Sequence, residues 1–347
     1  MQLPEREREK DMKIIQIGHY QLRRIGEARV RNEHKFHYGF IRNGHDTLHV
    51  SDRDLRVFYS PLGIRYFGRK RLNRKLIEGC EKFKPDMLMV AHCDNIENST
   101  LLEIRRLLPS IRIAYRNFDA LYMPKTLPKI HQRQNVVDHI FLSLAGEQIK
   151  QFETPKTRVS YIPNPVDRAI ESMDNSEKTT FDRDLLFCGN GSAGDPRFEL
   201  VTQVKKRVPH IVFETYGALG RPAVWGTQYD AVLAGTKMGL SLNRKEGEYL
   251  SSSTRLAQLM GNGILTFINE KTGLQEMLEG KAVFFRDQDD LVQKISAYHE
   301  DDALRIKVSG AGRKYYHQEF SSEKVTQYVV ESTLGLPLSQ EYVWHGR

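Results

Sequence analysis

The sequence lacks long apolar runs and contains few cysteines. Only three occur in 347 residues, at Cys80, Cys93 and Cys188, and no two of them form a CxxC pair. This spacing indicates neither a zinc site nor a disulfide framework. No run approaches the roughly 18–20 apolar residues that cross a bilayer, and the opening MQLPEREREK is charged, unlike a signal peptide. We therefore expect a cytoplasmic protein.

Low-complexity tracts rich in Pro, Gly or Ser are also missing. Hydrophobic residues make up 39% of the chain and charged residues 28%, which is typical of a folded protein and not of a disordered one. The length is too great for one ordinary core and suits two domains of roughly 150–180 residues. Two domains imply a cleft between them, where a ligand can bind.

The net charge of +8 is unevenly distributed. Residues 1–75 hold 18 Lys and Arg against 9 Asp and Glu, whereas the remainder holds 34 against 35. Such a basic region attracts nucleic acid, anionic lipid headgroups or an anionic acceptor, although a solvated face without a partner has the same composition. No zinc-finger spacing, RNP-like run or helix-turn-helix pattern is present, so we do not expect nucleic acid. We predict that basic residues 65–75 rest on an anionic membrane surface, on its inner face.

Strands and helices alternate along the first half of the chain. Buried strands are predicted at 12–20, 45–51, 83–92, 111–119 and 136–147, and helices before 43, at 69–84 and near 101–110. The helix that precedes the second strand ends at Asn43-Gly44, and a glycine is the usual stop signal. This alternation predicts a doubly wound parallel sheet.

A second series follows the polar stretch 171–184, which we interpret as a linker. Its predicted strands are 184–191, 210–217, 237–244, 263–269 and 281–285, with helices near 196–207, 253–262 and 272–279. The fold class is therefore α/β, with two Rossmann-like domains facing across a cleft. We predict an acceptor-binding domain at 1–170, a nucleotide-sugar-binding domain at 185–320, and a tail at 321–347 that returns toward the first domain.

The first candidate binding segment is CGNGSAGDPR (188–197), which directly follows a predicted strand. Ligands of open parallel sheets bind at the carboxyl ends of strands, where glycines admit the ligand and helix N-termini face anions. The spacing is not GxGxxG, so the dinucleotide fingerprint is absent, and an ordinary glycine turn remains an alternative. The predicted donor-binding residues here are Gly189, Asn190, Gly191 and Arg197.

The second segment, SLNRKEGEYLSSSTRLAQLMGNG (241–263), is more informative. A buried strand ends in a cluster of basic residues, and four consecutive hydroxyl residues then precede a helix. Hydroxyl caps, free N–H groups and the helix dipole favour a bound diphosphate, and an arginine in the first turn adds a charged contact. A plain capped helix is the alternative. The predicted donor-binding residues are Asn243, Arg244, Lys245, Glu246, Ser252, Ser253, Thr254, Arg255 and Gln258.

This segment resembles the nucleotide-sugar signature of retaining GT-B glycosyltransferases of group 1, and more closely the spore-maturation-protein-like branch. Glu246-Gly247 matches the EG loop, and RLAQLMGNG (255–263) matches the helix of the RTFEAMACG type. RNGHD (42–46), FKPDMLMVAH (83–92) and YIPNPVD (161–167) match further elements in the same order. The resemblance covers roughly residues 12–320 and implies transfer from a nucleotide sugar with retention at the anomeric carbon.

Two positions depart from the family pattern. Gln258 stands where the family has a glutamate that contacts the ribose; an amide both donates and accepts hydrogen bonds but has no charge. The stretch YRNFD (115–119) lacks the histidine of the T-x-H-D element, and Asp119 takes the neighbouring acidic position. These departures predict a different nucleotide orientation or altered activity.

For catalysis we predict Asp119 as the base or orienting group of the acceptor hydroxyl, with His19 and His92 as competitors at strand ends. Asp52-Arg53-Asp54 has DxD spacing but lies in a basic region, so we expect no metal site. No cofactor is expected beside the nucleotide-sugar co-substrate, because arginines supply the positive charge that a leaving diphosphate needs.

The leading hypothesis is a glycosyltransferase that transfers sugar to a glycan or glycolipid acceptor in bacterial surface polysaccharide or lipopolysaccharide synthesis. Two alternatives share the fold. A sugar-nucleotide epimerase releases nucleotide without a carbohydrate acceptor, and a non-catalytic binding module has no turnover. Nucleotide release that depends on an added acceptor separates the first hypothesis from the others.

Overall fold

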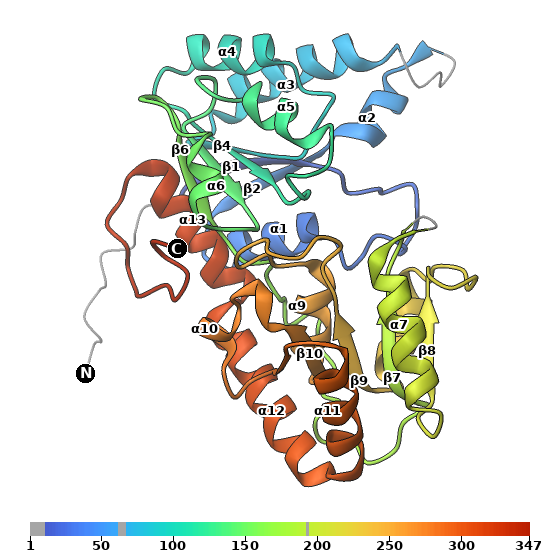
Figure 1. The fold of residues 1–347 in the computed structure, drawn as a ribbon. Helices are drawn as coiled ribbons and strands as arrows, with labels where there is room; N and C mark the ends of the chain where they lie inside the picture. Colours follow the sequence, from blue (N-terminus) through green and yellow to red (C-terminus); the bar gives the residue numbers. More distant parts are fainter. Residues whose placement is uncertain (1–10, 62–66, 192–193) are drawn as a thin grey trace, which may run out of the picture.

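The computed structural model describes residues 11–61, 67–191 and 194–347, arranged around two parallel sheets (Figure 1). The first sheet has the order β2-β1-β3-β4-β5-β6. We call this part of the protein the N-terminal domain. Its strands are β1 (Lys13–Gly18), β2 (Asp46–Ser51), β3 (Met87–Ala91), β4 (Arg112–Asn117), β5 (His139–Leu142) and β6 (Arg158–Tyr161).

The second sheet has the order β11-β10-β9-β7-β8 and forms the C-terminal domain. All strand pairs within both sheets are parallel. The predicted α/β class with two doubly wound sheets is therefore confirmed. The strands are β7 (Arg183–Cys188), β8 (Phe213–Tyr216), β9 (Thr236–Ser241), β10 (Leu265–Asn269) and β11 (Val283–Phe285).

Helices cover the faces of both sheets, as crossover connections between parallel strands require. The N-terminal domain contains α1 (Asn32–Arg42), α2 (Asp52–Phe58), α3 (Arg69–Phe83), α4 (Asn98–Leu107), α5 (Thr126–His131) and α6 (Glu147–Lys150). The later helices are α7 (Pro196–Arg207), α8 (Gly226–Ala234), α9 (Thr254–Gly261), η2 (Glu270–Thr272), α10 (Gln275–Leu278), α11 (Gln288–Glu300), α12 (Asp302–Glu319) and α13 (Ser322–Leu334). Across the described ranges, none of these helices has the length and apolar character of a membrane span.

Two chain segments cross between the domains. Residues 162–182 lead from β6 to β7, and the break between α12 and α13 leads back, so that α13 packs on α1 (Figure 1). The two segments pair through a bridge between Val166 and Ser321. The polar stretch at 171–184 is not a loose tether, because Glu171 and Asn175 are almost fully buried.

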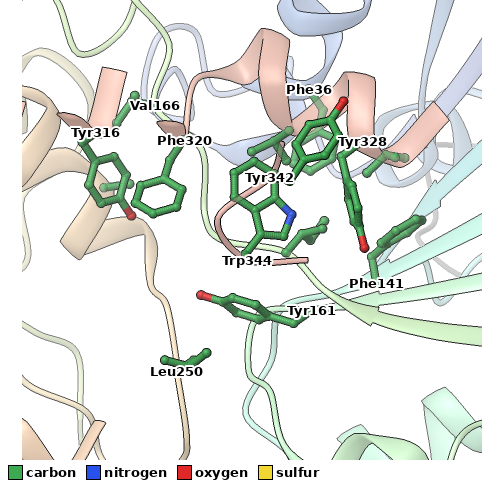
Figure 2. Packing of buried hydrophobic residues seen from close by; sticks show 14 of the residues in the cluster. Phe36, Phe141, Tyr161, Val166, Leu250, Tyr316, Phe320, Tyr328, Tyr342 and Trp344 are labelled. Carbon is green, nitrogen blue, oxygen red and sulfur yellow. The ribbon is translucent and has the colours of Figure 1, made fainter. Parts of the chain in front are cut away.

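Buried aromatic side chains pack around Val166, at this crossing (Figure 2). Trp344 is fully buried, and its ring lies 5.7 Å from that of Phe320. Tyr161 at the end of β6 and Leu250, in the loop before α9, belong to the same cluster. The tail and both domains thus share one core, and the predicted binding loop is anchored on it.

Candidate functional site

A cleft of about 630 Å³ lies between the carboxyl ends of the two sheets. Residues that follow β1, β3 and β4 form one wall, and residues that follow β7 and β8, with the first turns of α8 and α9, form the other. Ligands of doubly wound folds bind at such edges. A smaller cavity of about 220 Å³ adjoins the cleft, since Phe118 and Arg255 line both.

Three arginines gather on the C-terminal wall. Arg197 Nη2 lies 2.6 Å from Asp195 Oδ2 and donates to the Asn190 carbonyl at 3.2 Å. Arg244 donates to the same carbonyl, and its Nε lies 3.2 Å from the Asp195 carboxylate. Hydrogen bonds from Arg197, outweighing the effect of burial, hold the pKa of Asp195 below its usual range. The carboxylate therefore stays charged and keeps both guanidiniums at this edge.

Arg255 occupies the junction of the two cavities. Its guanidinium donates to the Cys188 carbonyl at 2.9 Å and to the Leu242 carbonyl. Burial and then the nearby Arg197 lower the pKa of Arg255 to about 10, so it remains charged at neutral pH. Because Cys188 ends β7 and Leu242 follows β9, Arg255 also ties α9 to both strands.

The hydroxyl residues before α9 have separate roles. Ser253 is the N-cap, and its Oγ accepts a hydrogen bond from the amide of Leu256. The amide of Ser252 donates to the Ser143 carbonyl, and its hydroxyl accepts from the amide of Asn164. Thr254 lines the large cleft, and Ser252 and Ser253 line the small one. The run is therefore more than a cap, because it also joins the two domains.

Gln258 lies one turn further along α9 and lines the large cleft. Its side chain is 4% exposed, and among the described residues its Nε2 has no hydrogen-bond partner. A buried amide donor without a partner costs free energy that a ligand acceptor recovers. This atom is thus available to donate a hydrogen bond to a ligand in the cleft.

Gly191, Lys245 and Glu246, three of the predicted donor-binding residues, line neither cavity. Glu246 forms an ion pair with Lys271 at 2.6 Å on the outer surface. Gly191 has a structural role, because a Cβ there would collide with the Asp195 carboxylate. Asn243 and Arg244 do line the small cavity, whereas Gly189 and Asn190 line the large one.

Glu248, which the sequence analysis missed, lies in the small cavity instead of Glu246. It is 7% exposed, and burial raises the pKa of its carboxyl. Gly247 between the two glutamates has a φ of +77°, a conformation that glycine adopts easily. The turn at Gly247 therefore places Glu246 on the outer surface and Glu248 in the small cavity.

On the N-terminal wall, His92 and Asp119 form one hydrogen-bonded unit. His92 Nδ1 lies 2.7 Å from Asp119 Oδ2, and His92 Nε2 accepts from Lys129 Nζ at 3.0 Å. Burial, the largest single effect, would raise the pKa of Asp119, but the hydrogen bond from His92 together with nearby positive charge, including Lys129, lowers that pKa overall. The two predicted catalytic candidates are thus a carboxylate and the imidazole that orients it, not competitors.

His19, the third predicted candidate, is held differently. Its Nε2 accepts hydrogen bonds from Gln21 at 2.8 Å and Arg53 at 3.2 Å. Burial, then Arg53 and Arg31, lower the pKa of His19 to about 4. The ring is therefore neutral at pH 7, and it orients the side chain of Arg53. Asp52 lies deeper, where its carboxylate accepts from Asn95 at 2.6 Å.

Asp54, the other acidic residue of the DxD spacing, accepts from the Leu22 amide at 2.8 Å and pairs with Arg23. Across residues 11–61, 67–191 and 194–347, no group of three or more His, Cys, Asp or Glu side chains is placed to hold a metal ion.

Comparisons with known proteins bear on the family and the fold. The family model described as glycosyl transferase-like matches residues 197–331, which include the arginines of the C-terminal wall. No curated protein sequence matches the chain. Sucrose-phosphate synthase from Thermosynechococcus elongatus has a similar structure, with a TM-score of 0.59 and 11% identity over 92% of this chain and 98% of that one. Residues 197–331 thus match a glycosyl transferase-like family, and the chain as a whole has the GT-B fold.

Two further structures have this fold. Anabaena HepE, solved in complex with UDP and glucose, has a TM-score of 0.58 and 11% identity over 94% of this chain and 100% of that chain. A Listeria monocytogenes protein assigned as a UDP-N-acetylglucosamine 2-epimerase has a TM-score of 0.53 and 10% identity over 96% of this chain and 99% of that chain. The fold is thus shared with a protein assigned as an epimerase, and the family match over residues 197–331 favours transfer.

Proposed function

We propose that this glycosyltransferase transfers a sugar from a nucleotide-activated donor to a glycan or glycolipid acceptor, and that it acts in bacterial surface polysaccharide or lipopolysaccharide synthesis. One observation carries the donor assignment: Arg197, Arg244 and Arg255 line the small cavity together with the N-cap of α9, and Arg255 also lines the large cleft. Three guanidiniums and the carboxylate of Asp195 leave two positive charges there. Such a site suits a diphosphate.

The two cavities suit the two ends of such a donor. The larger is lined by aromatic and apolar residues next to Gln258, which suits a nucleoside: Tyr216, Ala223, Val224, Trp225 and Tyr229. The smaller is lined by polar residues that suit sugar hydroxyls: Ser143, Asn243, Glu248, Ser251 and Ser252. In this proposal the arginines stabilise the leaving diphosphate without a cofactor, and Asp119 faces the acceptor hydroxyl.

Nucleotide release tests the proposed reaction. UDP-, GDP-, ADP- and CMP-sugars are incubated with the protein, with and without a mixture of glycan and lipid-linked acceptors, and free nucleotide is measured. We expect release that depends on the acceptor. Acceptor-independent release accompanied by sugar isomerisation would favour an epimerase, and nucleotide binding without any release would favour a binding module.

Arg244 gives the cleaner test of the donor site, since Arg255 also ties two strands together. Removing a charged hydrogen-bond donor costs about 1.5–3 kcal/mol, so Arg244→Ala should weaken UDP binding roughly 10- to 150-fold. Lys245→Ala, beside it but outside both cavities, is the matched control. Calorimetry with UDP measures both affinities, and thermal unfolding checks the fold. Equal affinities in the two variants would refute the donor-site assignment.

We further propose that the basic face of α3 rests on anionic lipid at the inner face of the membrane. Residues 65 and 66 of the predicted 65–75 segment lie outside the described residues. Arg69 is paired with Glu97 at 3.1 Å, whereas Lys70 is exposed and Arg71 lies 5.4 Å above the ring of Tyr59. Phe58, 77% exposed at the end of α2, adds an apolar contact on this side.

Neutralising this face should weaken membrane binding. At roughly 1 kcal/mol for each basic residue near an anionic surface, Lys70→Gln with Arg71→Gln should lower vesicle affinity roughly thirtyfold. Lys205→Gln with Lys206→Gln, exposed on α7, is the control. Co-sedimentation with phosphatidylglycerol vesicles gives the affinities. Binding that is insensitive to salt, or equal losses in both double variants, would contradict the proposal.

A further inference from the structure

The N-terminal wall of the cleft carries more positive charge than its own carboxylates neutralise. Five charged side chains of this domain line it: Arg31, Glu33, Arg53, Arg116 and Asp119. Asp119 is engaged by His92, as described above. Among the described residues, Glu33 supplies the only carboxylate within ion-pair distance of any of the three arginines.

Glu33 is shared by two of these arginines. Arg116 donates to it at 3.0 Å, and Arg31 Nε lies 3.2 Å from its other oxygen. Arg116 is 4% exposed, and its guanidinium lies 4.7 Å and 4.6 Å from the rings of Phe36 and Phe118. One carboxylate between two guanidiniums leaves one positive charge. That charge is accessible at Arg31, whose side chain is 36% exposed.

Arg53 contributes a second uncompensated charge. In the part of the chain that the structure describes, no carboxylate lies within ion-pair distance of its guanidinium, which donates to the neutral ring of His19. The neighbouring Asp54 is occupied by Ser51, Arg23 and the Leu22 amide. A neutral acceptor positions Arg53 without cancelling its charge. Arg31, Arg53 and His19 line the same cleft, and Arg53 contacts the His19 ring directly.

The proposed donor does not account for these two charges, because its diphosphate has three arginines on the opposite wall. On the basis of the proposed function, we infer that the acceptor carries an anionic group, a carboxylate or a phosphate, which Arg53 and Arg31 bind. Guanidinium forks match both groups in geometry and charge. The neutral His19 and Gln21 beside them complete a site that positions an anionic acceptor opposite the donor sugar.

The experiment uses three sugars of similar size: glucose, glucuronic acid and glucose 6-phosphate. Their affinities for the full-length protein are measured by ligand-observed NMR titration, with and without saturating UDP, and UDP affinity is measured by calorimetry. We expect both anionic sugars to bind at least about tenfold more tightly than glucose, as charged hydrogen bonds allow. A preference for only one of them identifies the carboxylate or the phosphate as the group that is recognised.

Arg53→Gln and Arg31→Gln should each reduce this preference to within about threefold and leave UDP affinity unchanged. Arg24→Gln is the matched control, because Arg24 is exposed, pairs with Glu27 and does not line the cleft. Thermal unfolding of each variant checks the fold.

Three results overturn the inference: equal or undetectable binding of the three sugars, a preference that survives in both variants, or a loss of UDP affinity as large as the loss of anion preference. The last result would assign these arginines to the donor. Failure of UDP binding in the wild-type protein, with the anion preference intact, would instead refute the proposed function alone.

Discussion

Asp119→Asn should lower the rate of sugar transfer by roughly 10²- to 10⁴-fold, the usual contribution of a positioned base. Asparagine keeps the size of the side chain but removes the charge that His92 Nδ1 now contacts at 2.7 Å. UDP affinity should not change, because the arginines proposed to bind the donor lie on the C-terminal wall. The measurement is kcat with an acceptor that supports wild-type transfer, beside a UDP titration.

Asp94→Asn is the matched control. Asp94 lies at the same edge of the sheet, pairs with Lys129 at 3.0 Å and does not line the cleft. Its substitution should leave kcat within about threefold of the wild-type value, because an exposed ion pair contributes little free energy. If Asp119→Asn and Asp94→Asn behave alike, Asp119 is not the group that accepts the proton or orients the hydroxyl.

The pH profile distinguishes the role of His92 from that of Asp119. Burial is the largest single effect on the pKa of Asp119, but the hydrogen bond from His92 together with nearby positive charge lowers that pKa overall. The carboxylate is therefore ionised throughout the neutral range, and the acidic limb of kcat/KM should lie below the ordinary range of an aspartate. In His92→Gln, burial would dominate and the acidic limb should move to higher pH. An unchanged limb would show that His92 does not position Asp119.

Local patterns predicted the elements that are strongly apolar or clearly terminated. β3 is buried at all five positions, and α7 begins at an Asp195 N-cap with Pro196 following, both of which are readable signals. α2 and α8 were not predicted, and neither has a side-chain cap at its N-terminus. Both contribute residues to the cleft, Arg53 from α2 and Tyr229 from α8.

Side-chain contacts between residues far apart in the chain could not be predicted from the sequence. His92 and Asp119 follow different strands, and only the β3–β4 pairing places them side by side. Glu33 and Arg116 are 83 residues apart. The alternation of strands and helices predicted a site at the carboxyl ends of the strands, but not which side chains bond there. Glu246 was chosen over Glu248 for the same reason, because the turn at Gly247 decides which glutamate faces inward.

The largest expected effect on stability concerns a buried ion pair at the domain crossing. Lys35 Nζ, on α1, lies 2.6 Å from Glu171 Oε1, and both side chains are at most 1% exposed. Lys35 also donates to the Pro165 carbonyl at 3.0 Å, and Glu171 accepts from the Asp167 amide at 2.8 Å. Removing one partner of such a pair leaves the other charge buried and unpaired. Lys35→Met should therefore lower the free energy of unfolding by about 3–5 kcal/mol.

The double variant Lys35→Met with Glu171→Leu separates pairing from packing. The double variant leaves no unpaired charge, so its free energy of unfolding, measured by chemical denaturation, should return most of the way to the wild-type value. If the losses of the two single variants simply add, the residues act by packing alone. Burial already raises the pKa of Glu171, and without Lys35 that pKa rises further. A folded-state pKa above the unfolded value gives stability that is lost as pH rises. The loss of unfolding free energy in Lys35→Met, relative to the wild type, should therefore be smaller at about pH 5 than at pH 8. Lys75→Met, which removes an exposed ion pair, should not measurably change the free energy of unfolding at either pH.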